Sequence, residues 1–309
     1  MMKKTNLITE AALLAAIYTI FFMISFYVPL LNTIVMWVLP LPFIFIIVRH
    51  TIKAGMILWA VTLALTLLFS VMALPLTLLF GSGGIVMGAL YKKRKSAFAI
   101  LLGGSLTYIA GFVLLYIASI LFLKIDIMKD SITLMKDSLE RADQFSKMIG
   151  GGNEAQLQSL YDSLDVLQYL APSALLIVGV LFALLTQLVA NMVLKRFRIE
   201  VPPFPPFREW SFPKSFLWYY LGIILLSFVS SEVGSPLYIA AVNLILILEN
   251  IMIIQGITVI FYFSYLKKWP KAVPVMAVIF SFLLALPLQL IKFLGIIDLG
   301  FNLRKRMKS

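Results

Sequence analysis

The sequence contains no cysteine and a single histidine, His50. These absences exclude disulfide bonds, zinc sites built on thiolates, cysteine nucleophiles and any mechanism that needs two histidines. The chain also lacks a G-x-x-x-x-G-K-S/T phosphate-binding loop, an H-E-x-x-H zinc motif and a G-x-S-x-G nucleophile motif. We therefore expect a protein that is not an enzyme and that holds no cofactor and no metal ion.

Charge is scarce as well. Only 13% of the 309 residues are charged and 61% are hydrophobic, whereas soluble domains have about 25% charged and about 45–50% apolar residues. A chain of this composition suits a lipid bilayer, in which helices satisfy their own backbone hydrogen bonds. The composition predicts an all-α, polytopic membrane protein in contact with the lipid bilayer.

The charges are distributed unevenly. Residues 124–169 hold eight of the 14 acidic side chains and five basic ones, so this segment has a net charge of −3 and the remainder +15. Short cytoplasmic loops of membrane proteins are rich in Lys and Arg. Six basic clusters mark such loops: Lys3-Lys4, Arg49 with Lys53, Lys92-Lys93-Arg94-Lys95, Lys195-Arg196 with Arg198, Lys267-Lys268 with Lys271, and Arg304-Lys305-Arg306 with Lys308. The first five fall at every second connection, which predicts a cytoplasmic N-terminus, an extracellular acidic segment and no nucleic-acid partner.

A helix needs about 20 apolar residues to cross the hydrocarbon core. This length gives nine candidate spans, near residues 7–28, 30–48, 54–73, 75–91, 97–123, 169–194, 215–232, 237–266 and 272–290. A ninth full crossing would leave the last basic cluster outside, so we favour a hairpin over residues 272–303, where Pro287 interrupts the apolar run. The chain is thus expected to have about 8–10 membrane segments.

The spans form two groups. Residues 1–194 are predicted to be a six-span N-terminal membrane unit that includes an extracellular helical hairpin over 124–168, and residues 215–309 a C-terminal membrane unit. In the hairpin, apolar residues repeat at helical spacing on either side of a predicted turn at Gly150–Gly152. Between the units, five prolines within residues 199–213 prevent a helix. Residues 195–214 are therefore predicted to be a Pro-rich cytoplasmic linker.

The most informative polar residue is Glu249, near the middle of the eighth candidate span. Asn250 follows it, and Asn243 lies seven residues before Asn250, on the same helical face. A carboxylate at this depth costs several kcal/mol unless it is paired, protonated or exposed to water. We expect these three residues to bind substrate, with a solute or Lys292 as the partner of Glu249. The alternative is a protonated Glu249 bonded to Asn250 and a neighbouring helix.

Small residues mark two other spans. The fourth span contains Gly81 and Gly84, and glycine-interrupted spans place irregular backbone beside transporter cavities; tight helix packing explains them equally well. In the first span, four alanines form two overlapping pairs with a spacing of four residues, which allows close helix approach: Ala11 with Ala15, and Ala12 with Ala16. Their partner helix lies either in this chain or in another protein.

Three segments carry a resemblance to known families. The start TNLITEAALLAAIYTIFFMISFYVP, the short second span with Pro40 and Pro42, and LFGSGGIVMGALYKKRKS over 79–96 resemble the YybS-like family of uncharacterised polytopic membrane proteins of Gram-positive bacteria. More distantly, about residues 5–194 resemble the substrate-binding (S) components of energy-coupling-factor transporters. Those components have six membrane helices, bind vitamins or similar micronutrients from outside, and dock onto a coupling subunit through small residues of the first helix.

The resemblance implies a protein of the bacterial cytoplasmic membrane that binds a small-molecule solute and works with a membrane coupling subunit and ATPases. Ala12 and Ala16, or Ala11 and Ala15, would then form the docking face. The outer hairpin and the C-terminal unit depart from the S-component pattern. Two further hypotheses remain: a non-transporting membrane scaffold that recruits partners through the hairpin or the Pro-rich loop, and, lowest in rank, an intramembrane enzyme that acts on lipid.

Overall fold

The computed structural model describes residues 2–148, 154–229 and 232–307, and within these ranges the regular structure is helical without a strand. The chain divides into two compact units. The first unit consists of Met1–Asp130 and Ala174–Pro203, and the second unit consists of Ser131–Ser173 and Phe204–Ser309. The domain boundaries expected from the sequence stay a prediction; the structure groups the hairpin arms with the C-terminal part of the chain.

The first unit is a helical bundle with an aromatic core. Its helices are α1 (Met2–Tyr27), α2 (Pro29–Val35), α3 (Leu41–Arg49), α4 (Ile52–Phe69), α5 (Leu74–Lys92), α6 (Ala97–Ala118) and most of α9 (Ala171–Arg196). Thr51 and Ser96 are the N-cap residues of α4 and α6, since each side chain accepts a hydrogen bond from a backbone N–H of the first turn. In the core, the Tyr18 hydroxyl donates to Thr77 at 2.8 Å, and the Tyr18 ring packs against Phe43.

The expected span over 30–48 is broken in the structure. The helix α2 ends at Val35, and a turn through Pro40 precedes α3. With nine residues, α3 extends about 14 Å, about half the thickness of the hydrocarbon core. Residues 41–47 are all buried, so this helix packs inside the first unit instead of crossing the membrane as a separate span.

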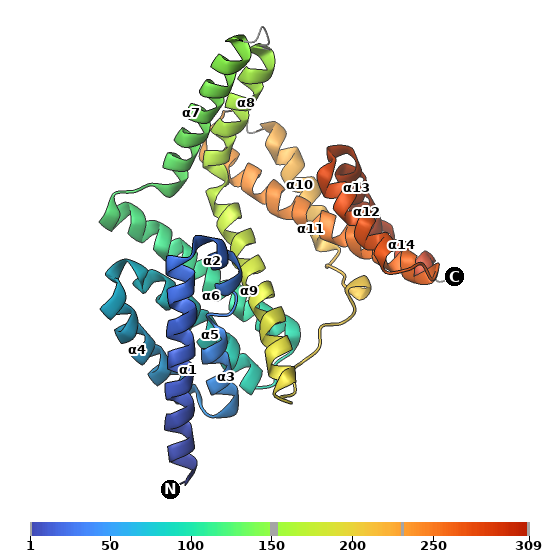
Figure 1. Cartoon of the computed structure of the whole chain (residues 1–309). Coiled ribbons are helices and arrows are strands. Elements are labelled where there is room, and N and C mark those ends of the chain that lie inside the picture. The colour runs from blue at the N-terminus through green and yellow to red at the C-terminus, as the bar shows by residue number, and fades with distance from the viewer. Residues whose placement is uncertain (1, 149–153, 230–231, 308–309) are drawn as a thin grey trace. The chain divides into compact units, whose positions relative to one another are not determined.

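The second unit contains the outer hairpin and the C-terminal helices. Its helices are most of α7 (Ile127–Met148), then α8 (Glu154–Leu167), α10 (Ser215–Val229), α11 (Pro236–Leu266), α12 (Ala272–Leu283), α13 (Ala285–Phe301) and α14 (Leu303–Arg306). The two arms α7 and α8 lie side by side (Figure 1, green), and Lys136 Nζ lies 2.6 Å from Asp165 Oδ1 across them. The turn predicted at Gly150–Gly152 lies outside the described residues.

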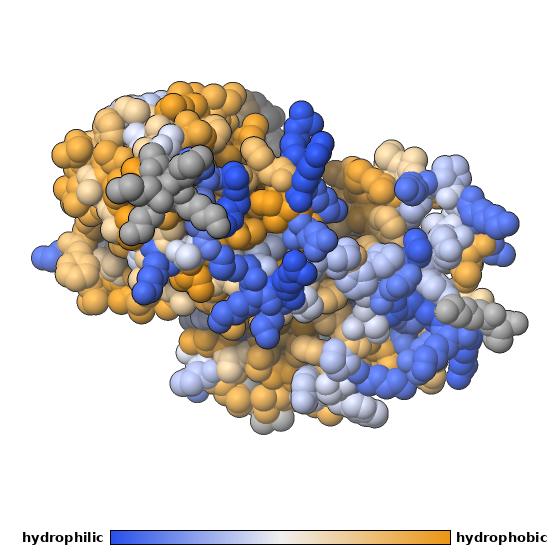
Figure 2. All heavy atoms as spheres, turned by 90° about the horizontal axis from the view of Figure 1, so that it is seen from below, coloured by the Kyte–Doolittle hydropathy of each residue, from blue (hydrophilic) through white to orange (hydrophobic). Residues whose placement is uncertain are grey.

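Long apolar helices confirm a polytopic, all-α membrane protein. Among the described residues, six helical segments are long and apolar enough to cross a membrane: Asn6–Tyr27, Ile52–Phe69, Val71–Lys92, Ala97–Leu123, Leu157–Arg196 and Pro236–Leu266. The bent pair α12 and α13 adds a seventh if it is counted as one span, and α10 is a shorter apolar helix. Hydrophobic residues cover much of the surface seen in Figure 2 (orange), as expected of faces in contact with lipid.

The C-terminal segment bends sharply between two helices, and the choice between one crossing and a hairpin stays a prediction. The axes of α12 and α13 differ by 118° at Leu284. Between α11 and α13, Glu249 pairs with Lys292 and Gln255 pairs with Asp298. The later residue of α11 contacts the later residue of α13, so the two helices run in the same direction. The basic residues after α13 therefore lie at the same end of the second unit as those after α11.

The Pro-rich segment forms no α-helix, and both of its ends pack against helical units. Residues 199–206 adopt no helix, as five prolines predict. Ile199 packs against the core of the first unit, whereas the Phe207 ring lies against Phe261 of α11 at 5.4 Å. The second half of this segment is thus a fixed part of the second unit.

Candidate functional site

Two glycines bring α11 and α13 together in the second unit. A Cβ atom at Gly256 would lie 1.9 Å from the carbonyl oxygen of Ile291, and one at Gly295 would lie 1.9 Å from that of Met252. No side chain fits at either position, because backbone is the obstacle on both sides. This close approach positions the polar side chains that lie one or two turns away along the two helices.

Glu249 forms an ion pair in this packing. Its Oε1 atom lies 2.7 Å from Lys292 Nζ of α13 and accepts a hydrogen bond from the Tyr220 hydroxyl of α10 at 3.2 Å. Lys292 is therefore the partner, one of the two that the sequence predicted for Glu249. The carboxylate side chain retains 31% of its exposure and the lysine side chain 12%. The pair lies among three apolar helices, and its carboxylate is only partly buried.

The two asparagines on α11 form hydrogen bonds with backbone groups and not with this ion pair. Asn250 donates to the carbonyl oxygen of Leu246 in its own helix at 2.8 Å. Asn243 accepts from Ser173 N at 2.9 Å and donates to Tyr169 O at 2.6 Å. Asn243 therefore fastens the start of α9 to α11, and the structure does not join it to Glu249.

A second polar cluster on the same two helices was missed from the sequence. Gln255 of α11 donates to Asp298 Oδ2 at 2.5 Å, and Arg304 Nε donates to the same oxygen at 2.9 Å. Arg304 also donates to the carbonyl oxygens of Arg208 and Trp210. Asp298 is only 3% exposed. Asp298 and Arg304 are six residues apart, on either side of the end of α13. This short spacing is the only local signal in the sequence that could have indicated the cluster.

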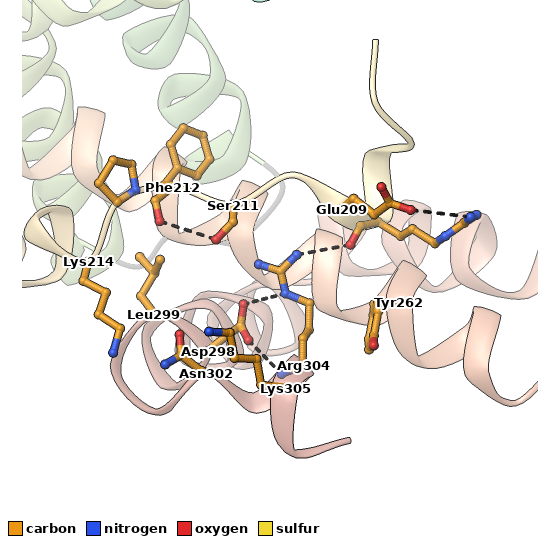
Figure 3. Close-up of a pocket in the computed structure, with 12 residues that line it drawn as sticks. Glu209, Ser211, Phe212, Lys214, Tyr262, Asp298, Leu299, Asn302, Arg304 and Lys305 are labelled. Carbon is orange, nitrogen blue, oxygen red and sulfur yellow. Dashed lines mark hydrogen bonds and ion pairs between the residues drawn. The ribbon is translucent and has the colours of Figure 1, made fainter. Parts of the chain in front are cut away.

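A pocket of about 470 Å³ lies beside this cluster. Its wall is formed by the segment before α10, by the last turns of α11 and α13, and by α14 (Figure 3). The side chains around it are mostly polar or charged: Arg208, Glu209, Ser211, Lys214, Tyr262, Asp298, Asn302, Arg304 and Lys305, with Phe212, Pro213 and Leu299. The Tyr262 hydroxyl is buried and has no hydrogen-bond partner among the described residues.

In the first unit, the predicted glycines are packing positions. A Cβ atom at Gly81 would lie 2.1 Å from the Trp59 ring, and one at Gly84 would lie 2.7 Å from the carbonyl oxygen of Pro40. Both are buried. Of the two explanations that the sequence allowed, tight helix packing matches these contacts.

The alanines of α1 divide between two faces. Ala15 is buried and Ala11 half-buried, so these two pack inside the first unit, whereas Ala12 and Ala16 are exposed. Directly before Ala11, the Glu10 carboxylate lies 2.7 Å from both Arg49 Nη1 and His50 Nε2. This pairing of Glu10 was not expected from the sequence.

Comparison with known proteins places these features in a family. A family model described as "Predicted membrane protein (DUF2232)" matches residues 16–299. The chain belongs to this DUF2232 family. It is also 36% identical to "Uncharacterized protein YybS" of Bacillus subtilis (strain 168), over 310 residues that cover 99% of this chain and all of the relative. No solved structure matches the chain.

Membership of the DUF2232 family and the match to YybS confirm the YybS-like resemblance seen in the sequence and the identification of a membrane protein. The matched residues span both units and include Glu249, Lys292 and Asp298. Neither the DUF2232 description nor the relative's name states an activity.

Proposed function

We propose that the protein is a solute-binding membrane subunit, and that Glu249, Lys292 and Tyr220 form its binding centre. The ion pair carries the proposal: a carboxylate and an ammonium lie 2.7 Å apart within apolar helices, and part of the carboxylate remains exposed. Asn250, one residue from Glu249, is half-buried and adds a side-chain amide at the same level. A small solute with a cationic or hydrogen-bonding group can compete with Lys292 for this carboxylate.

The cost of such a pair argues that it does more than hold helices together. Removing two charges from water costs several kcal/mol per ion, and apolar residues of similar size often stabilise a protein as well or better. Ionisable residues within membrane segments are accordingly associated with ligand and ion sites. The Gly256 and Gly295 packing already joins α11 to α13, so the ion pair is not needed for that contact.

The proposal includes separate energising partners and no catalysis. The sequence has no nucleotide-binding loop, so we assign energy coupling to a membrane coupling subunit and ATPases supplied by other chains. In this account the exposed Ala12 and Ala16 of α1 face the coupling subunit. We place the protein in the bacterial cytoplasmic membrane with its N-terminus in the cytoplasm, following the positive-inside distribution of its basic loops.

The test is affinity purification of the full chain from native membranes, followed by mass spectrometry of bound small molecules and proteins. A solute enriched with the wild-type chain and lost from Glu249→Gln supports the proposal. The matched control is Glu232→Gln, which removes an exposed carboxylate of the same unit and should retain the solute. Repeated purification without a solute or a coupling subunit contradicts the proposal.

A specific observation favours a scaffold as the second candidate. The arms α7 and α8 enclose an apolar groove of about 520 Å³ lined by Leu134, Met135, Leu139, Leu160 and Leu164. Leu134 and Met135 are exposed although they belong to the hairpin that the charge pattern places outside the membrane. A scaffold would recruit another protein's apolar segment to this groove. It predicts that Leu134→Ser abolishes co-purification of that protein without changing the bound solute.

A further inference from the structure

The pocket beside Asp298 carries excess positive charge. Four basic residues line it (Arg208, Lys214, Arg304, Lys305), against the carboxylates of Glu209 and Asp298. Both carboxylates are occupied: Arg304 and Gln255 bind Asp298, and Arg208 Nη2 lies 3.7 Å from Glu209 Oε1. The ammonium groups of Lys214 and Lys305 are left, in the described part of the chain, without an acidic partner. The pocket is thus suited to an anion.

The Tyr262 hydroxyl provides an independent indication of a ligand. Tyr262 is 8% exposed and lines the pocket, and its hydroxyl finds no partner within the residues that the structure describes. A buried hydroxyl without a hydrogen bond costs about 1–3 kcal/mol, so unmatched groups of this kind call for an explanation. The hydroxyl oxygen itself is buried, so an acceptor oxygen that enters the pocket becomes its partner once the adjacent side chains shift.

The location of the pocket identifies the source of the anion. It opens beside Tyr262 and Leu299, in the last turns of the apolar helices α11 and α13, close to where charged residues begin. Figure 3 shows Lys214, Asn302, Arg304 and Lys305 around it, with Phe212 and Leu299 among them. Basic pockets between membrane helices at the cytoplasmic surface bind the head groups of anionic lipids.

A second hollow borders the same arginine. Arg208 also lines an aromatic groove of about 520 Å³ with Phe207, Phe261, Tyr265 and Trp269. The guanidinium carbon of Arg208 lies 3.8 Å from the centre of the Tyr265 ring. An apolar groove beside a basic pocket accommodates a lipid, whose acyl chain and phosphate differ in polarity, better than it accommodates a soluble phosphate compound.

We propose that the pocket bounded by Tyr262, Lys214, Arg304 and Lys305 binds a phosphate group, presented by an anionic phospholipid. The phosphate oxygens accept a hydrogen bond from the Tyr262 hydroxyl, and Lys214 and Lys305 add positive charge to the same pocket. The neutralised Asp298 and Glu209 leave the pocket with a net charge of +2, which favours the anionic head group. This site is separate from the ion pair of Glu249 and does not depend on the function proposed for it.

The experiment measures the thermal stability of the purified full chain in detergent during titration with lipid. Phosphatidylglycerol should raise the melting temperature in a saturable manner, because a ligand that binds only the folded protein stabilises it by mass action. Zwitterionic phosphatidylcholine at the same concentration should have little effect. Inorganic phosphate and glycerol phosphate form the soluble arm, and an equal or larger shift from them than from phosphatidylglycerol would overturn the assignment to lipid.

Two substitutions test the individual groups. Tyr262→Phe should weaken phosphatidylglycerol binding about tenfold, since it removes a hydrogen bond to a charged acceptor. Without lipid its stability should be unchanged or higher, because the lost hydroxyl has no protein partner. Lys305→Gln should weaken binding about fivefold, as expected for one basic residue near an anionic head group.

Matched controls remove the same groups elsewhere in the second unit. Tyr219→Phe alters an exposed tyrosine of α10, and Lys267→Gln alters a lysine at the end of α11 that lines neither hollow. Both should retain wild-type lipid affinity. Equal binding by all four variants, or a lower melting temperature of lipid-free Tyr262→Phe, would overturn the proposal.

Discussion

A Cβ atom added to Gly295 would lie 2.9 Å from the backbone nitrogen of Gly256. The two glycines thus remove the side chains that would separate α11 from α13. Without hydrophobic driving force between helices in lipid, close backbone approach of this kind supplies packing energy. The polar centre of the second unit depends on it, because Glu249 and Lys292 lie one to two turns away on the same helices.

Gly256→Ala and Gly295→Ala should each destabilise the protein by at least about 1–3 kcal/mol, the usual cost of overpacking. The obstacle is backbone in both cases, so no side-chain movement can relieve it. Gly222→Ala is the matched control, since a Cβ there meets nothing within 4 Å. Thermal unfolding in detergent measures all three, and equal melting temperatures would contradict the glycine contact.

Glu249→Gln should destabilise the second unit by about 1–3 kcal/mol, because it leaves the largely buried Lys292 ammonium without its counter-charge. The partial exposure of Glu249 keeps this value below that of a fully buried pair. The double variant Glu249→Gln/Lys292→Met should recover most of the loss. A double-mutant cycle of melting temperatures checks this, and additive losses would show that the two residues do not act as a pair.

Asp298→Asn should cost about 3 kcal/mol or more. Asp298 is buried against Arg304, and removal of one partner from a buried pair leaves an uncompensated charge. The corresponding change at an exposed pair, Asp165→Asn opposite Lys136, should cost no more than about 1 kcal/mol. The ratio of the two losses is the measurement. Similar losses at both positions would mean that Arg304 is solvated.

The absence of cysteine makes topology directly measurable. Single variants Lys268→Cys and Lys305→Cys should be protected from a membrane-impermeant maleimide in intact cells, because α13 runs in the same direction as α11 and both ends belong to the cytoplasmic side in our proposal. Ser138→Cys on α7 should react. Reaction of Lys305→Cys from outside, with Lys268→Cys protected, would indicate a single crossing over 272–303.

Some of these features could be predicted because the membrane makes isolated charge expensive. Glu249 and Lys292 are ionisable residues within otherwise apolar segments, and their mutual neutralisation follows from that cost. The fold class followed from composition, and the lack of a helix over residues 199–206 from proline chemistry. Such inferences require no knowledge of how distant segments meet.

Other features depend on contacts that the sequence does not encode locally. Asn243 shares a helical face with Asn250, yet the structure uses it to bind the backbone at Tyr169 and Ser173, about 70 residues earlier. The break between α2 and α3 is a partial exception, since Pro40 and Pro42 were visible in the expected span. The charged partner of Asp298, Arg304, lies beyond the end of α13, where an apolar pattern gives no information.

The most direct test of the proposed function compares small molecules bound to the wild-type chain with those bound to Glu249→Gln/Lys292→Met. The double variant should be folded and as abundant in the membrane as the wild type, because both charges are removed together. If Glu249 and Lys292 bind a solute, mass spectrometry should detect that solute with the wild type and not with the double variant. Retention of the same solute by the double variant, or the absence of any solute from the wild type, would contradict it.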